Sequence, residues 1–233
     1  MGRKPSRIDK NLTQKTKATK FEFPDAVLSL NSSLKRYEYL PVPECIMDDK
    51  VIIINKFLSD LVSQELCSSF SQAGVMELFR QRGTKEYAER INDRFASYNP
   101  KVAGILWERL LKCLSQDDHV METLGFMNAK GLNPQLRTYR YGKGHMFAKH
   151  YDSSVVVPNE GTTRWTLLVY LTGGDQLVGG DTIFYSASNQ KYPAVHPQVG
   201  MALLHKHGDD CLLHEAQEVY DGVKWVLRSD VVF

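Results

Sequence analysis

The chain has 233 residues, of which 42% are hydrophobic and 24% charged, and its formal net charge is +2. This composition is typical of a globular protein that buries a core, and it excludes collagen-like, disordered and disulfide-scaffold proteins. No segment approaches the roughly 18 consecutive apolar residues of a membrane span, and the first residues lack the apolar core of a secretory signal. We therefore expect a cytoplasmic or nuclear protein without a membrane partner. The four cysteines show no CxxC spacing, which indicates reduced thiols rather than a zinc site.

The N-terminus differs in charge from the rest of the chain. Residues 1–20 carry seven Lys or Arg against a single Asp and contain almost no apolar residue. Such a segment cannot offset the entropy lost on ordering, so residues 1–40 are predicted to form a basic, flexible extension. Three interpretations of its charge stay open: nuclear targeting, attraction to nucleic acid, and solubilisation alone.

The first predicted elements are a short strand and a helix. The β-branched run 51–54 predicts a buried strand. The segment 59–70 begins with capping residues and repeats apolar side chains at helical intervals, which predicts an amphipathic helix. These elements begin a region, residues 41–130, that we expect to be mainly helical.

A second helix follows a long polar stretch. Asn99 can cap this helix, Pro100 suits its first turn, and an apolar stripe follows. The polar stretch before it, residues 83–98, is expected to be a long loop that covers a site.

From residue 136 onward, apolar and polar residues alternate with a period of two, which is typical of β-strands. Gly, Pro, Asn and Asp separate the alternating segments at the short intervals of a sandwich or barrel. The predicted strands are 136–142, 146–152, 164–172, 181–185, 199–207, 211–215 and 223–232. The predicted architecture is one α+β domain over residues 41–233, in which helices of 41–130 support an antiparallel double sheet over 131–233.

His150 and Asp152 are the first residues that point to chemistry. Residues i and i+2 of a strand share a face, so this imidazole and this carboxylate can bind one metal ion. His214, late in the β region, can supply a third ligand from another strand. Two His and one carboxylate on one face of a metal leave three positions open, which is the arrangement of the non-haem Fe(II) oxygenases.

A His-x-Asp triplet alone is weak evidence, because the chain contains a second one at residues 207–209. Gly208 and Asp209 are typical of a turn between strands, where the alternation of side chains breaks down. We therefore interpret His205 and His207 as strand-end residues with polar partners. The same structural role is expected for His119, His145 and His196.

Four blocks of sequence resemble, in order, the core of one enzyme family. They are residues 136–152, which include His150 and Asp152; 164–171; 179–184, with Gly179-Gly180-Asp181-Thr182; and 214–225, from His214 to Trp225. Together they resemble the 2-oxoglutarate/Fe(II) dioxygenases, especially the prolyl 4-hydroxylase-like branch. The resemblance covers residues 130–233 and implies a double-stranded β-helix (jelly-roll) core with supporting N-terminal helices.

The resemblance also implies the cofactors. Fe(II) would be held by His150, Asp152 and His214, and 2-oxoglutarate would be the co-substrate, with ascorbate as a further candidate. The reaction would couple the decarboxylation of 2-oxoglutarate to succinate and CO2 with the hydroxylation of a C–H bond. Halogenases of the superfamily replace the carboxylate ligand with a small residue, and Asp152 argues against that chemistry.

The distal carboxylate of 2-oxoglutarate needs a cation with hydroxyl partners when it is buried. Lys224 stands where the hydroxylase-like branch carries this cation, and Thr166 and Tyr141 occupy the positions of its hydroxyl partners. Arg228 shares a strand face with Lys224 and is the alternative anchor, because a guanidinium could hold the carboxylate through two hydrogen bonds.

The expected substrate is a protein side chain, prolyl or similar. Phe147 weakens the prolyl assignment, because many prolyl hydroxylases carry a Tyr there. Two alternatives stay open: an oxidative demethylase of nucleic acid, favoured by the basic tail, and a non-catalytic metal-containing binding module on the same scaffold.

Asn92 and Arg94, within the expected loop 83–98, are predicted to face the substrate. The resemblance implies a mobile loop ahead of the barrel that closes over a peptide. An Arg and an Asn in such a lid could fix a substrate by directed hydrogen bonds. The alternative is an exposed loop whose charges are only solvated.

Overall fold

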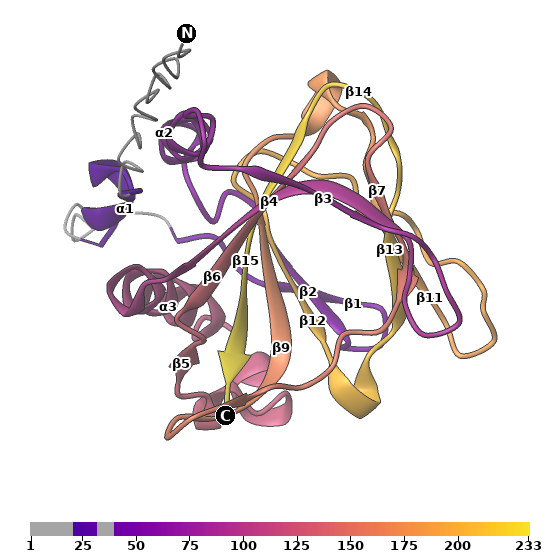
Figure 1. Cartoon of the computed structure of the whole chain (residues 1–233). Helices are drawn as coiled ribbons and strands as arrows, with labels where there is room; N and C mark the ends of the chain where they lie inside the picture. The colour runs from indigo at the N-terminus through magenta and orange to yellow at the C-terminus, as the bar shows by residue number, and fades with distance from the viewer. Residues whose placement is uncertain (1–20, 32–39) are drawn as a thin grey trace, which may run out of the picture.

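The computed structural model describes residues 21–31 and 40–233 (Figure 1). The basic residues 1–20, and with them the expected roles of the N-terminal tail, lie outside this part of the chain. Residues 21–31 belong to the core rather than to a flexible extension, because Phe23, Val27 and Leu30 are buried. Within the described ranges, no helix has both the length and the apolar character needed to cross a membrane.

The two long helices begin where the sequence predicts. The Ser59 hydroxyl accepts a hydrogen bond from the backbone N–H of Val62, and the Asn99 side chain accepts one from Val102. The α-helices are α1 (Asp25–Leu28), α2 (Asp60–Phe70) and α3 (Pro100–Leu114). Shorter helical turns are η1 (His119–Thr123), η2 (Phe126–Asn128), η3 (Gly174–Gln176) and η4 (Gly208–Asp210).

All seven strands predicted after residue 136 are present, with ends shifted by a few residues. The early strands are β1 (Glu44–Ile46), β2 (Val51–Ile54), β3 (Glu77–Gln81) and β4 (Arg90–Tyr98). The later strands are β5 (Gly131–Leu132), β6 (Gln135–Tyr141), β7 (Met146–His150), β8 (Val156–Val157), β9 (Gly161–Tyr170), β10 (Val178–Gly179), β11 (Thr182–Tyr185), β12 (Ala202–Lys206), β13 (Leu213–Ala216), β14 (Val219–Asp221) and β15 (Lys224–Val232).

Most strands belong to one curled antiparallel sheet with the hydrogen-bonded order β1-β2-β12-β9-β15-β6-β4-β7-β13-β11. Strands β3, β5 and β8 pair alongside β4, β15 and β9, and β10 pairs with β14 separately. The sheet forms a half-barrel (Figure 1), consistent with a double-stranded β-helix. The predicted fold class, α+β with a jelly-roll core and supporting helices, is confirmed.

The expected loop 83–98 is wrong for its second half, which is strand β4. This strand pairs with β3, β6 and β7. Region 41–130 therefore contributes β2 and β4 to the sheet as well as helices. Asn92 and Arg94 thus lie in a paired strand rather than in a loop, and their role toward the substrate stays a prediction.

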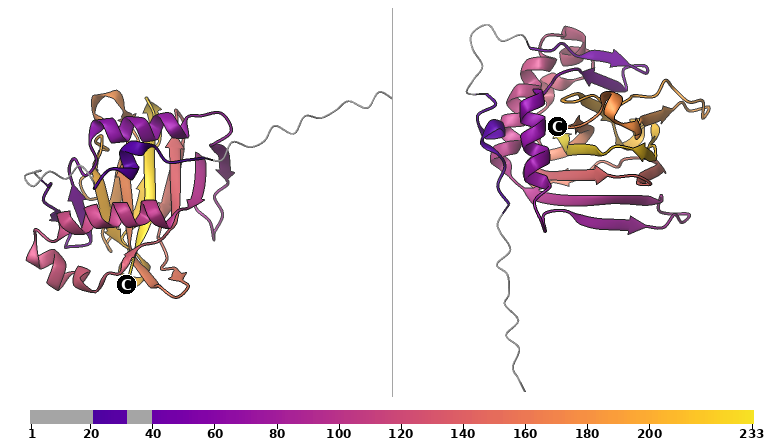
Figure 2. Two further views of the ribbon diagram at one scale, coloured as in Figure 1. Left: turned by 90° about the vertical axis from the view of Figure 1, so that its left-hand side faces the viewer. Right: turned by 90° about the horizontal axis from the view of Figure 1, so that it is seen from above.

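Helices α2 and α3 cover one face of the sheet (Figure 2). Phe70 of α2 stacks on Trp225 of β15 with 6.3 Å between ring centroids, and Leu106 of α3 is buried in the same cluster. Successive residues of a strand point to opposite faces. Trp225 and Leu227 therefore face the helices, which leaves Lys224, Val226 and Arg228 on the concave face.

Candidate active site

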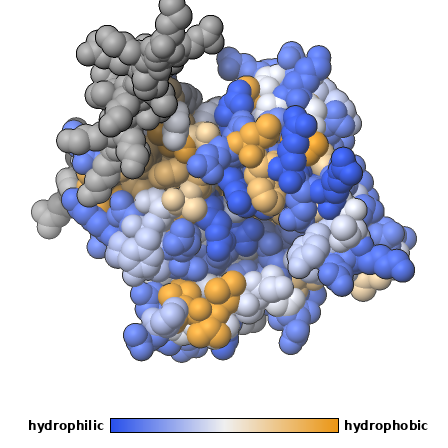
Figure 3. Space-filling view, viewed as in Figure 1, coloured by the Kyte–Doolittle hydropathy of each residue, from blue (hydrophilic) through white to orange (hydrophobic). Residues whose placement is uncertain are grey.

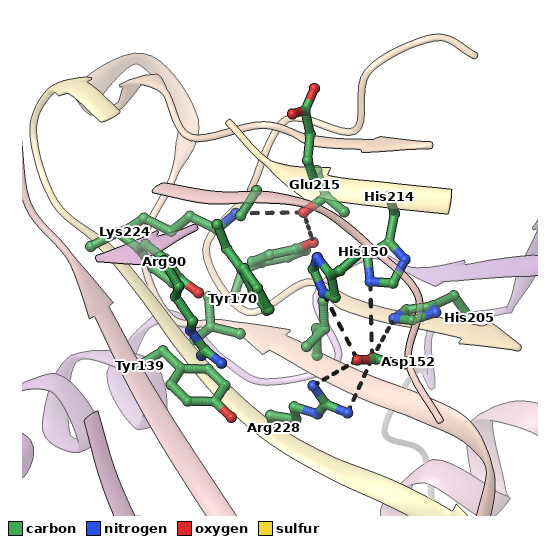
Figure 4. Close-up of a pocket in the computed structure, with 16 residues that line it drawn as sticks. Arg90, Tyr139, His150, Asp152, Tyr170, His205, His214, Glu215, Lys224 and Arg228 are labelled. Carbon is green, nitrogen blue, oxygen red and sulfur yellow. Dashed lines mark hydrogen bonds and ion pairs between the residues drawn. The ribbon is translucent and has the colours of Figure 1, made fainter. Parts of the chain in front are cut away.

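Polar side chains from several strands meet on the concave face because the strands pair in register. Lys224 of β15 is opposite Tyr141 of β6, and Val226 is opposite Tyr170 of β9. These residues line one pocket, together with the expected metal ligands (Figure 4). The surface on the side seen in Figure 1 is largely hydrophilic, with only small separate apolar patches (Figure 3).

His150, Asp152 and His214 come together at one end of this pocket. His150 ends β7 and pairs with His214 of β13. Nε2 of His150 lies 3.8 Å from Oδ1 of Asp152, and Nε2 of His214 lies 3.9 Å from Oδ2. The donor atoms of the three residues all lie within 4.8 Å of one another, close enough for one ion. Two imidazoles and one carboxylate suit Fe(II), so the residues present fit this metal.

Backbone hydrogen bonds fix the orientation of both imidazoles. Nδ1 of His150 lies 2.8 Å from the carbonyl oxygen of Ala148, and Nδ1 of His214 lies 2.9 Å from that of Leu212. A carbonyl oxygen only accepts, so Nδ1 carries the proton and Nε2 presents its lone pair, as in metal-binding histidines. Burial, with His214 nearby, lowers the pKa of His150 to about 3, and burial also lowers the pKa of His214. Both imidazoles are therefore neutral near pH 7, as metal binding requires.

Asp152 is ionised because Arg228 opposes the effect of burial. Burial alone would raise the pKa of Asp152, but the Arg228 guanidinium and the adjacent histidines hold this pKa well below its ordinary value. The Thr166 hydroxyl also donates to Oδ2 of Asp152 over 2.9 Å.

Thr166 and Arg228 lie at the metal end of the pocket rather than beside Lys224. Thr166 is opposite Asp230, six residues along β15 from Lys224, so its hydroxyl lies away from the residue expected to anchor 2-oxoglutarate. Arg228 is paired with Asp152 and with Asp230, whose Oδ1 lies 3.2 Å from its Nη2. Arg228 is thus already engaged by two carboxylates, which favours Lys224 as the anchor.

Lys224 lies at the other end of the pocket among hydroxyl groups. Its Nζ donates to the carbonyl oxygen of Gly180 over 2.6 Å and lies 3.5 Å from Oγ1 of Thr182. The Tyr170 hydroxyl lies 2.7 Å from the same Thr182 oxygen, and Tyr141 also lines this end. Burial lowers the pKa of Lys224 to about 7. Among the described residues, Asp181 acts on this ammonium through its charge without forming an ion pair with it, so this end suits a carboxylate ligand.

Sequence reasoning missed Tyr170 and Thr182 as neighbours of Lys224. Their positions depend on the register of β9 and β11, which pair with strands distant in the sequence. The Gly179–Phe184 block contained the only signal, because it carries Thr182.

His205 lies near the end of β12 with a polar partner, as expected, because its Nδ1 lies 3.1 Å from the carbonyl oxygen of Lys206; it also lines the pocket, which was not expected. It is only 1% exposed, and its Nε2 lies 3.6 Å from Oδ2 of Asp152. Burial lowers the pKa of His205 well below its ordinary value. The only indication of this place in the sequence was that His205 is a polar residue after the apolar residues of its strand. His207 is as expected, because its Nδ1 lies 3.1 Å from the Thr166 hydroxyl oxygen.

The two residues expected to face the substrate differ in environment. Asn92 is fully buried, and neither polar atom of its side chain has a hydrogen-bond partner in the described chain. Arg94 is exposed, and its guanidinium lies 3.8 Å from the centroid of the Phe79 ring. Arg94 lines a groove of about 700 Å³ that adjoins the pocket. Its charged lining residues are Arg90, Arg94, Arg137, Arg228 and Glu77.

Comparisons with known proteins agree with this geometry. Residues 136–229 match the model of the 2OG-Fe(II) oxygenase superfamily. A comparison with curated protein sequences gave no match. One similar solved structure is a viral collagen prolyl hydroxylase from Paramecium Bursaria Chlorella virus-1 in a 2OG complex, at 17% identity and a TM-score of 0.52, covering 78% of this chain and 95% of that chain.

Two further solved structures share the fold. A prolyl-4-hydroxylase of Pseudomonas putida is 16% identical with a TM-score of 0.54, covering 78% of this chain and 92% of that chain. A prolyl hydroxylase of Trichoplax adhaerens, in complex with a hypoxia inducible factor oxygen degradation domain peptide fragment, is 19% identical with a TM-score of 0.55, covering 78% and 83%. At these identities the likeness shows the fold alone. The matched segment, residues 136–229, is similar to the 2OG-Fe(II) oxygenase superfamily.

Proposed function

We propose that the protein is a 2-oxoglutarate-dependent dioxygenase that hydroxylates a C–H bond of a protein side chain and releases succinate and CO2. One observation carries the proposal: a single pocket has His150, Asp152 and His214 at one end and the buried cation of Lys224 at the other. Bound iron would supply the oxidation chemistry.

The residues of the chain hold and orient the reactants. We propose that the ammonium of Lys224 binds the distal carboxylate of 2-oxoglutarate, with hydroxyl groups of Tyr141, Tyr170 and Thr182 around it. The opposite end of the co-substrate, a 2-oxo acid, then faces the metal ligands. The buried walls exclude water, which strengthens the ion pair with Lys224.

The groove beside the pocket supports a polypeptide substrate. Arg90 lines both the pocket and the groove, and its guanidinium lies 4.3 Å from the centroids of the Tyr139 and Phe147 rings. Among the four Arg that line the groove, Arg137 and Arg228 form ion pairs with Asp230. The guanidinium groups of Arg90 and Arg94 remain, and with them the groove suits a segment with acidic side chains beside the oxidised residue. We propose that Arg94 contacts such a segment and that the unpaired amide of Asn92 gains a polar partner when ligands bind.

Prolyl hydroxylation is the first candidate reaction, and the prolyl hydroxylases named above support it through their shared fold. Oxidative demethylation of nucleic acid is the second candidate, because guanidinium groups also bind phosphate. A non-catalytic binding module is disfavoured by the complete set of metal ligands together with Lys224. Ascorbate as a further cofactor and the cytoplasmic or nuclear location stay predictions.

The test is succinate production with candidate substrates. The protein is supplied with Fe(II), 2-oxoglutarate, O2 and ascorbate, and then with proline peptides flanked by Asp and Glu, matched peptides flanked by Lys, or methylated oligonucleotides. We expect succinate in step with the addition of one oxygen atom to the acidic peptides, and none with Asp152→Ala. Product only from oligonucleotides would favour demethylation, and no turnover despite bound metal and 2-oxoglutarate would favour a binding module.

A further inference from the structure

Three imidazoles, rather than two, converge on Asp152 (Figure 4). The third belongs to His205 of β12, and its Nε2 is the closest of the three to the carboxylate, at 3.6 Å from Oδ2. His205 is opposite Thr166 in the β12–β9 pairing, so its side chain shares the concave face with Asp152's neighbours. The family's three ligands do not account for this side chain.

His205 is held in the same way as the two expected metal ligands. Its Nδ1 lies 3.1 Å from the carbonyl oxygen of Lys206, so Nδ1 carries the proton and Nε2 presents a lone pair. His150 and His214 make the same kind of Nδ1 bond to Ala148 and Leu212. This backbone bond fixes the tautomer and ring orientation that a metal requires.

The lone pair of His205 has no donor to meet it. Nε2 is buried and lacks a hydrogen-bond partner in the part of the chain that the structure describes. It faces Oδ2 of Asp152, an acceptor that already receives the Thr166 hydroxyl and lies 3.0 Å from Nη2 of Arg228. Burying the unpaired Nε2 of His205 is unfavourable, and a cation bound at Asp152 would satisfy it.

A site using Cys211 explains the arrangement less well. His205, Cys211 and His214 also lie close enough to hold an ion. However, Sγ of Cys211 lies 3.9 Å from Nδ1 of His214, which is the protonated nitrogen already bonded to Leu212. The same sulfur accepts a hydrogen bond from the backbone N–H of Asp152 over 3.3 Å. Nε2 of His205 and Nε2 of His214 lie 3.6 and 3.9 Å from Oδ2 of Asp152, so both can reach a cation bound at this carboxylate.

We propose that His205 is a fourth protein ligand of the metal when 2-oxoglutarate is absent. This inference rests on the metal site of the proposed function but not on its substrate. Octahedral coordination offers about six positions, and four protein donors with a chelating 2-oxo acid would fill them all. We therefore assign His205 to the state without co-substrate and expect 2-oxoglutarate to weaken its contribution.

Co(II) titration of the whole protein without 2-oxoglutarate tests the assignment. His205→Phe removes the nitrogen but keeps a flat ring beside Phe184, whose centroid lies 5.6 Å away. His207→Phe is the matched control, because it removes a buried imidazole from the end of the same strand. We expect His205→Phe to raise the Kd for Co(II) by at least about tenfold and to change the visible absorption bands of the ion. The control should keep the bands, and saturating 2-oxoglutarate should narrow the difference between His205→Phe and the parent.

The outcomes separate this inference from the proposed function. If the parent binds no Co(II), the proposed function fails at its metal site. If the parent binds Co(II) and His205→Phe shows the same Kd and bands, only the role of His205 is overturned. Equal losses in both variants would also overturn it, because they indicate a general loss of structure. Should His205→Phe fail to show a cooperative thermal transition, His205→Gln answers the same question, since a retained parent spectrum in that variant excludes coordination.

Discussion

The guanidinium of Arg228 reaches both oxygens of Asp152, with Nη2 3.0 Å from Oδ2 and Nη1 3.3 Å from Oδ1. This pair lies inside the metal site. The positive charge of Arg228 is therefore next to the same carboxylate that would bind the metal ion. Arg228 keeps the carboxylate ionised and oriented before a metal arrives.

Replacing Arg228 should therefore shift the acid limit of metal binding. In Arg228→Gln, burial is no longer opposed, so the pKa of Asp152 rises and the carboxylate protonates at a higher pH. A group with a depressed pKa contributes stability that is lost as the pH falls through that pKa, and this loss also moves to higher pH. Metal titration from about pH 4 to pH 7 measures the shift. Arg164→Gln serves as the control, and an unchanged pH profile in Arg228→Gln would contradict the prediction.

The expected ligands can be tested one at a time. His150→Ala or His214→Ala should abolish stoichiometric binding of Fe(II), because each removes an Nε2 donor aimed at Asp152. Asp209→Ala and His207→Ala remove the second His-x-Asp triplet and should leave stoichiometric binding intact. Calorimetric titration under anaerobic conditions measures it. Loss of iron in the second pair and its retention in the first would overturn the assignment.

Lys224→Met should weaken the binding of 2-oxoglutarate about a hundredfold while leaving the metal in place, because it removes a buried charge partner. The same change should stabilise the ligand-free protein. Burial lowers the pKa of Lys224 to about 7, so its charge destabilises the folded state at every pH below the unfolded value. The gain in unfolding free energy is at most about 5 kcal/mol. Lys149→Met, an exposed lysine, is the control, and a fall in the Tm of Lys224→Met would contradict this account.

Binding of 2-oxoglutarate should depend on pH through Lys224. Only the ammonium form attracts the distal carboxylate, and the pKa of about 7 means that this form declines above neutrality. The Kd should therefore rise with pH above 7, by up to about tenfold per unit, with uptake of a proton on binding. Calorimetry in buffers of different ionisation enthalpy detects the proton. Lys224→Arg should lose this dependence, since guanidinium stays charged, whereas a flat profile in the parent would exclude the mechanism.

Arg94→Ala should reduce turnover of an acidic peptide without changing the uncoupled decarboxylation of 2-oxoglutarate. Arg94 lines the groove outside the pocket, so its loss removes a charged contact to the substrate alone. One such contact corresponds to roughly a tenfold rise in KM. Arg94→Lys should restore part of the effect. Equal effects on both reactions, or on neither, would support an Arg94 that is merely solvated.

The C-terminal strands were predictable because each has one apolar face. Trp225 and Leu227 pack under the helices while Lys224 and Arg228 face the pocket, so the period of two is visible in the sequence. Strand β4 has no such face. Its concave positions, Arg90, Asn92 and Arg94, are polar because they lie by the pocket and groove, and polar runs favour a loop when only the sequence is considered.

The proximity of His150 and Asp152 was predictable from their spacing of two residues, although β7 ends at His150 and Asp152 follows it outside the strand. Thr166 and His205 needed the pairing of β9 with β12, a contact between distant segments that local patterns do not encode. The sequence therefore indicated neither the contact of Thr166 with Asp152 nor the place of His205 in the pocket.

Strand β4 lies between β6 and β7, so the sheet that carries the expected metal ligands includes a strand from outside residues 136–229. Residues 136–229, which match the superfamily and contain all three expected ligands, do not form a complete sheet. Without β4, the facing edges of β6 and β7 would have unpaired N–H and C=O groups, and edges of that kind lead to aggregation. The ligand-bearing strands therefore depend on β4, and a fusion or chimera that keeps their edges paired takes its breakpoint before β4.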